Sequence, residues 1–115
     1  MDKSIMEACT SVLDYMDKLS PTIINLYESI REYDLADIIV LADITEGLKW
    51  VSEAASNINA SLSLGITEEI NSITDQIKDI ALAMENSDYL FLADILEYDV
   101  IENMEKIFNA IAAVS

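Results

Sequence analysis

The sequence predicts an all-α fold, in the form of a four- or five-helix antiparallel bundle built from two similar helical hairpins. The 115 residues include only two glycines and one proline, which leaves few residues suited to the turns of β-hairpins. Apolar residues recur at intervals of three and four rather than two, which is the period of a helix. A chain of this length fits one domain, residues 1–115.

The first helix is expected from about residue 3 to residue 19. Its apolar residues recur at helical spacing and form the face that would pack on other helices: Ile5, Cys9, Val12, Met16 and Leu19. Because Cys9 lies within this stripe, we interpret it as a small buried apolar residue rather than a reactive thiol.

Ser20 and Pro21 follow the first stripe. Ser20 is suited to an N-cap and Pro21 to the first position of a helix, where its missing N–H is no loss. This favours a break or sharp kink at Pro21, followed by a second helix that carries Ile23, Leu26, Tyr27 and Ile30. One long helix kinked at Pro21 is the alternative, because a helix can absorb a proline at a cost of about 3 kcal/mol.

Asp34 and Asp37 indicate the start of the next helix, by capping and by a favourable position in the first turn. This helix is expected to run from residue 34 to about residue 61. Its stripe alternates four-residue and three-residue steps, as in helical bundles: Leu41, Ile44, Leu48, Val51, Ala55, Ile58 and Leu62. Gly47 is unfavourable inside a helix, so we expect a neighbouring helix to approach closely there.

The remaining chain predicts two more helices. Ser61 to Gly65 reads as a loop, with Thr67 suited to cap the next helix. That helix carries another regular stripe: Ile70, Ile73, Ile77, Ile80 and Met84. Asn86 to Asp88 ends it, and the last helix is expected to continue to about Ala113.

A ten-residue phrase occurs twice in the chain. Asp37–Glu46 reads DIIVLADITE and Asp88–Glu97 reads DYLFLADILE, with six of ten positions identical. The repeated unit is expected to be a helical hairpin, about residues 16–62 and 67–113. Two hairpins can cover each other's apolar faces in a closed bundle, whereas a solenoid usually needs three or more repeats.

Composition limits the partners. Hydrophobic residues make up 52% of the chain, and 22 acidic residues against 6 basic ones give a formal charge of −16. Such a charge repels phosphates, so we expect no nucleic acid or membrane partner, whereas basic protein surfaces and cations are suitable. The apolar run from Ile38 to Ala42 is far too short to span a membrane. No signal peptide is recognisable, so a cytoplasmic location is expected.

The side chains needed for most catalytic chemistry are missing. The chain has no histidine, one cysteine, and no glycine-rich phosphate-binding loop, so we expect neither an enzyme nor a cofactor. Only carboxylates remain. Asp37 and Asp88 are explained as helix-start residues, and Asp43 and Asp94 flank the apolar stripes.

Glu46 and Glu97, at the end of each phrase, are harder to explain. On a regular helical wheel Glu97 shares a face with apolar residues and has no basic residue three or four positions away, while Glu46 has Lys49. A carboxylate in an apolar stripe must be hydrogen-bonded, protonated or bound to a cation. The alternative function is therefore a divalent-cation site or metal-dependent phosphohydrolase on Glu46 and Glu97, with Asp43 and Asp94 as weaker ligand candidates.

Several large apolar residues lie off the main stripes. Ile39 and Trp50 are nearly opposite Leu41 and Leu48, so this helix needs cover on two sides. The first helix or a second chain would supply it. Tyr89 and Tyr98 add amphipathic rings of the kind found at helix interfaces.

Residues 87–100 read SDYLFLADILEYDV. This segment resembles a family of small acidic helical proteins of Gram-positive bacteria that carry a D-Y-x-x-L-A-D-x-L-E-Y-[DE] motif and have no assigned biochemical function. Some of them are thought to accompany motility genes. The family pattern usually has a proline soon after E-Y-[DE], where this chain has Val100 and Ile101. The resemblance implies no catalytic residues.

Together these features favour a non-enzymatic protein–protein interaction module, such as an adaptor or a secretion-type chaperone. We expect it to bind a helical segment in an apolar groove or to form a homodimer. The residues expected at such an interface are Ile39, Trp50, Tyr89 and Tyr98.

Overall fold

The computed structural model describes residues 2–115, and helices account for most of them. No strand occurs among these residues, so the all-α prediction is confirmed. The elements, in chain order, are α1 (Lys3–Arg31), the 3-10 turn η1 (Ile38–Val40), α2 (Leu41–Leu62), α3 (Thr67–Glu85), α4 (Tyr89–Asp94), the π-helical segment η2 (Ile95–Val100) and α5 (Ile101–Ala112).

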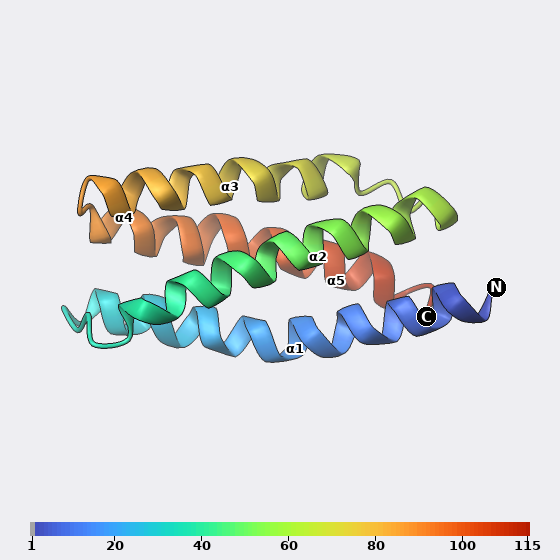
Figure 1. Cartoon of the computed structure of the whole chain (residues 1–115), viewed down its shortest axis with the longest axis horizontal. Helices are drawn as coiled ribbons and strands as arrows, with labels where there is room; N and C mark the ends of the chain where they lie inside the picture. Colours follow the sequence, from blue (N-terminus) through green and yellow to red (C-terminus); the bar gives the residue numbers. More distant parts are fainter. Residues whose placement is uncertain (1) are drawn as a thin grey trace.

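Because α4, η2 and α5 adjoin one another without a gap, the chain forms four helical rods (Figure 1). The rods run alternately up and down, and both ends of the chain lie at the same end of the bundle (Figure 1). The last rod consists of α4, η2 and α5. Helix α1 packs against α2 and against this last rod, and α3 packs against the same two rods. This closed arrangement is that of an antiparallel four-helix bundle. No helix within residues 2–115 is long and apolar enough to cross a membrane.

Helix α1 passes through Pro21 without interruption, so the predicted break into two helices is wrong. The alternative of one long helix is the observed one. Pro21 lies on the exposed side, whereas buried residues on both sides of it keep one continuous face toward the core. Packing of that face outweighs the hydrogen bond that proline cannot make.

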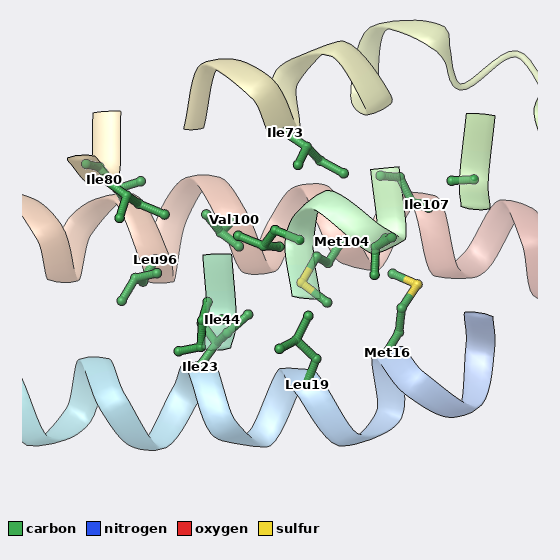
Figure 2. Close-up of a cluster of buried hydrophobic side chains, with 14 of the residues drawn as sticks. Met16, Leu19, Ile23, Ile44, Ile73, Ile80, Leu96, Val100, Met104 and Ile107 are labelled. Atoms are coloured by element: carbon green, nitrogen blue, oxygen red, sulfur yellow. The ribbon is translucent and has the colours of Figure 1, made fainter. Parts of the chain in front are cut away.

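The buried core is continuous along the bundle, and all four rods contribute to it. Figure 2 shows part of it, with Met16, Leu19 and Ile23 of α1 facing residues of the other three rods. The predicted stripes of α1 and α2 are buried, apart from half-buried Ile5 and Leu62 at their ends. Cys9 is fully buried, as predicted, and burial raises the pKa of its thiol.

Gly47 of α2 marks a close helix contact, as expected. A Cβ atom at this position would lie 3.1 Å from Cζ of Tyr15 and 3.2 Å from Cδ1 of Leu19, both on α1. The Tyr15 ring therefore lies directly against the α2 backbone. It also contacts Trp50 edge-on, with the two ring centroids 5.0 Å apart.

Two helix starts differ from the prediction. Asp34 accepts a hydrogen bond from the Ala36 amide in a local turn, and α2 begins only at Leu41, after η1. Thr67 is the first residue of α3 rather than its cap, and its hydroxyl accepts a hydrogen bond from Asn59. By contrast, Asp88 caps the last rod by accepting from the Phe91 amide.

The π-helical segment η2 corrects the register of the last rod. If α2 is aligned through the repeated phrase, its buried Leu48, Val51 and Ala55 correspond to Asp99, Glu102 and Lys106. These three charged residues are exposed, and the buried residues are each one position later: Val100, Asn103 and Ile107. A π-helical turn takes in one extra residue. It thereby returns the apolar residues to the core and turns the charged ones outward.

Candidate functional site

An apolar groove of about 670 Å³ lies between α2 and α3. Its lining combines residues of the 3-10 turn, of the first three turns of α2 and of the second half of α3. They are Ile38, Ile39, Leu41, Ala42, Thr45, Lys49, Ile77, Ile80, Ala81 and Met84. The groove is therefore built from the first copy of the repeated phrase and from the helix that comes after α2.

Side-chain size explains why this part of the helix pair is hollow. Ala42 and Ala81 are exposed residues too small to fill the space between the outer faces of the helices. Ile80, which is 3% exposed, and half-buried Ile77 supply apolar surface from α3. Ile39 at the rim is 84% exposed and adds apolar surface to that of the groove lining.

Charge around the groove is distributed unevenly. Lys49 is the only charged residue in the lining, and its ammonium group lies 3.5 Å from Oε1 of Glu46. Both side chains are more than half exposed, so this ion pair contributes little to stability. Asp37 and Asp43, close in sequence to the lining residues, are exposed as well.

The four predicted interaction residues do not form one surface. Ile39 lines the groove, whereas Trp50 packs against Tyr15 of α1 and is 42% exposed. Tyr89 is half-buried and lines a different cavity, near the α1–α2 connection. Tyr98 belongs to the π segment, and Cζ of Arg31 lies over its ring, 5.6 Å from the ring centroid. Only Ile39 remains at the groove.

Arg31, the last residue of α1, forms ion pairs with two of the predicted metal ligands, Asp94 and Glu97. Its Nε donates to Oε1 of Glu97 at 2.8 Å, and its Nη2 donates to Oδ1 of Asp94 at 2.9 Å. The hydrogen bonds that the guanidinium donates to Asp94 and Glu97 raise the pKa of Arg31. The guanidinium thus joins the end of α1 to the last rod at the point where the π segment begins.

Nearby, burial and the negative charge of Glu97 raise the pKa of the Tyr27 phenol. Glu97 itself is half-buried and its carboxylate is hydrogen-bonded, which is one of the states required of a carboxylate in an apolar stripe. Glu46 is 76% exposed at its side chain and pairs with Lys49. Asp43 and Glu46 do not join the Arg31 cluster.

Within residues 2–115, no group of three or more histidine, cysteine, aspartate or glutamate side chains is placed to hold a metal ion. The cations that Glu46 and Glu97 contact in the structure come from the chain itself. The arrangement of the carboxylates thus gives no observation in favour of the cation-site alternative.

Sequence reasoning missed Arg31 and most of the groove. Arg31 is the only arginine in the chain, but its partners lie 63 and 66 residues away, beyond any local spacing rule. The α3 wall of the groove has a weak signal in Ala81, an exposed small residue beside the apolar stripe. On the helical wheel Glu97 shares a face with Leu90 and Met104, and the structure divides this face, because Leu90 is 59% exposed whereas Met104 is 2% exposed.

Comparison with protein families finds a match over residues 7–110 to a family described as a domain of unknown function, DUF8042. The chain belongs to the DUF8042 family. The match includes nearly the whole bundle, from the first turns of α1 to α5, and so both the groove and the Arg31 cluster are parts of the DUF8042 domain. No curated protein and no solved structure matches the chain.

Proposed function

We propose that this protein is a non-enzymatic interaction module, adaptor-like or chaperone-like, that binds an amphipathic helix of a partner protein. The α2–α3 groove is the binding site in this proposal. We place the role in the cytoplasm of a bacterial cell, in keeping with the resemblance of residues 87–100 to proteins of Gram-positive bacteria.

The observation that carries the proposal is the exposed apolar surface of the α2–α3 groove, which is large enough to receive the apolar side chains of a partner helix. The groove measures about 670 Å³, and Ile39 is 84% exposed at its rim. Covering a side chain such as Ile39 is worth about 1.5–3 kcal/mol, so an apolar partner surface gains affinity here. A helix that presents apolar residues at every third or fourth position matches a groove between two helices.

Charge favours a basic partner. The chain carries a formal charge of −16, and the one lysine of the groove is already paired with Glu46. Lysine or arginine residues beside the apolar face of an incoming helix would therefore meet a negative surface, which speeds association and excludes acidic helices. A second copy of this chain has the same charge, so a homodimer through this groove would bring like charges together.

Synthetic helices test the proposal directly. We would measure fluorescence anisotropy of three labelled peptides with the protein: a leucine–lysine amphipathic helix, a leucine–glutamate helix, and a scrambled leucine–lysine peptide without an apolar face. Binding of the first peptide alone is expected. Equal binding of the scrambled peptide would mean that charge alone drives association and would overturn the groove.

Matched variants locate the binding surface. Ile39→Ser and Ala42→Glu should each weaken binding about tenfold, since each alters the groove surface. Leu90 is the counterpart of Ile39 in the second copy of the phrase, is 59% exposed and lines a different cavity. Leu90→Ser should therefore leave binding unchanged, and equal loss in both variants would contradict the assignment.

Sedimentation of the protein alone tests whether a second copy of the chain, rather than a separate partner helix, occupies the groove. We expect a monomer at micromolar concentration. A dimer that dissociates on Ile39→Ser substitution would mean that a second copy covers the groove, and it would overturn the proposal of a separate helical partner.

A further inference from the structure

The repeated phrase places the same two carboxylates on α2 and on the last rod. Its seventh and tenth positions are Asp43 and Glu46 in the first copy, and Asp94 and Glu97 in the second. The pair in the second copy is occupied, because the guanidinium of Arg31 donates to Glu97 at 2.8 Å and to Asp94 at 2.9 Å. The second copy therefore shows which chemical group this pair of side chains binds.

The pair in the first copy has no arginine of its own. Arg31 is the only arginine in the chain, and it is bound to the last rod. Lys49 lies 3.5 Å from Glu46, but both side chains are more than half exposed, so this ion pair is weak and easily displaced. Asp43 is exposed, and none of the ion pairs within residues 2–115 includes it. A guanidinium for this pair has to come from another molecule.

Asp43 and Glu46 are spaced to bind one guanidinium together. Helix α2 is regular from Leu41 onward, so residues three positions apart are neighbours on its surface. Three steps of 100° leave their side chains about 60° apart around the helix axis. A guanidinium presents its N–H donors as a planar fork that can bond two carboxylates, whereas an ammonium group acts as a point charge. The pair therefore favours arginine over lysine.

This pair of carboxylates adjoins the α2–α3 groove. Ala42 and Thr45, the residues directly before Asp43 and Glu46, both line the groove. Lys49, which contacts Glu46, lines it as well. A helix that lies in the groove thus passes beside the pair, so one partner can fill the groove with apolar side chains and reach the carboxylates with a long basic one.

We propose that the partner helix of the α2–α3 groove carries an arginine whose guanidinium binds Asp43 and Glu46 together, as Arg31 binds Asp94 and Glu97 in the second copy. This inference rests on the proposed function, because the arginine belongs to the helix that fills the groove. It adds a rule of partner specificity. A basic helix with an arginine at one particular position binds more tightly than a helix with lysine there.

An arginine scan of the leucine–lysine helix tests the rule. Each lysine is replaced in turn by arginine, and binding to the full chain is measured by fluorescence anisotropy. Arginine at one position should tighten binding about fivefold, because only there does the guanidinium reach both carboxylates. Citrulline at that position keeps the shape of arginine without its charge and should bind more weakly than lysine. An equal gain at every position, or no gain at any, would overturn the inference.

Variants of the protein locate the carboxylates. Asp43→Asn and Glu46→Gln should each abolish the gain from arginine, and both residues are exposed, so the fold should be kept. Binding of the all-lysine helix should change less than twofold in these variants, because the groove is intact. Glu53→Gln is the matched control, since it removes one exposed acidic charge from the same helix outside the groove lining. Equal loss of the arginine gain in Glu53→Gln would mean that net charge alone is responsible and would refute the assignment.

The groove proposal and the arginine inference fail in different ways. If no amphipathic helix binds in a manner that Ile39→Ser weakens, both are wrong. If the leucine–lysine helix binds through Ile39 but arginine gives no gain at any position, the groove stands and the arginine inference alone is overturned.

Discussion

Deletion of Tyr98 should be tolerated far better than deletion of a residue from an ordinary helix. Tyr98 lies within the π segment, which contains one residue more than a regular helix needs to keep its register. Removing it converts the segment to an α-helix without rotating the remainder of the rod. The residues that stay in the core are Val100, Met104, Ile107 and Ile111, each at most 2% exposed.

The loss of unfolding free energy on deletion of Tyr98 depends on the contacts that its side chain makes. Tyr98 is 58% exposed, and its loss removes the stacking of Arg31 on its ring, worth about 0.5–1 kcal/mol. We therefore expect a decrease of about 1–2 kcal/mol in the free energy of unfolding. If the deletion instead rotated the rest of the helix by 100°, the four core residues would leave the core. At about 1.5–3 kcal/mol each, that loss equals the whole stability of a typical domain.

Deletion of Lys49 from α2 is the matched control. It lies in the regular helix that carries the first copy of the phrase, and it is exposed. Its removal rotates fully buried Val51, Ala55 and Ile58 away from the core. Equilibrium unfolding in urea, followed by far-ultraviolet circular dichroism, should show a folded Tyr98 deletion and an unfolded or severely weakened Lys49 deletion. Equal damage in the two proteins would refute the register argument.

Three further predictions concern packing and charge. Gly47→Ala should destabilise the fold by about 1–3 kcal/mol in urea unfolding, although alanine normally favours helices, because the added methyl group meets Tyr15; the loss should be smaller in a Tyr15→Leu background. Arg31→Met should lower the free energy of unfolding by about 1–2 kcal/mol, since the Arg31 and Glu97 side chains are each only about one-third exposed, and Arg31→Lys should restore less than half of that loss; an unchanged urea midpoint would contradict the role of the cluster. Stability should fall as pH rises from about 9 to beyond 10, because the folded state raises the pKa of Cys9 above 9.0 and that of Tyr27 above 10.0. The unfolded chain then releases these protons first, and Cys9→Ala should remove the lower part of the pH dependence.

The buried faces of α1 and α2 could be predicted from the sequence because each has a regular period of three and four, whereas on α3 the predicted Ile77 and Met84 are only half-buried. Stripe residues of α2 such as Ile44, Leu48 and Val51 are all fully buried. Helix boundaries were less predictable. Asp34 can cap a helix or close a local turn with equal chemistry, and the choice depends on the packing of the whole connection.

The π segment was not predicted because a helical wheel assumes 100° per residue throughout. A signal was nevertheless present in the last rod, where Leu92, Leu96, Val100 and Met104 are separated by three consecutive steps of four. Each step of four overshoots a full turn by about 40°, and three steps overshoot by about the rotation of one residue. Such a run therefore indicates either an apolar stripe that moves gradually around a regular α-helix or a π-helical turn that restores the register. Because all four residues are buried, the π-helical turn is the correct alternative.

The functional surfaces differ between the two copies of the phrase because the chain diverges directly after each. Gly47 comes after the first copy and lets Tyr15 of α1 lie against the backbone of α2, which is a regular helix. After the second copy the extra residue is taken up by the π segment, which turns Asp99 toward α3 and places its carbonyl on Gln76. The leucine and isoleucine positions that the copies share, Leu41/Leu92 and Ile44/Ile95, lie in the core. The packing of each half is set by the residue directly after each copy, so substitutions at Gly47 and Tyr98 should alter local packing, whereas truncation of the buried leucines and isoleucines that the copies share should destabilise the whole fold.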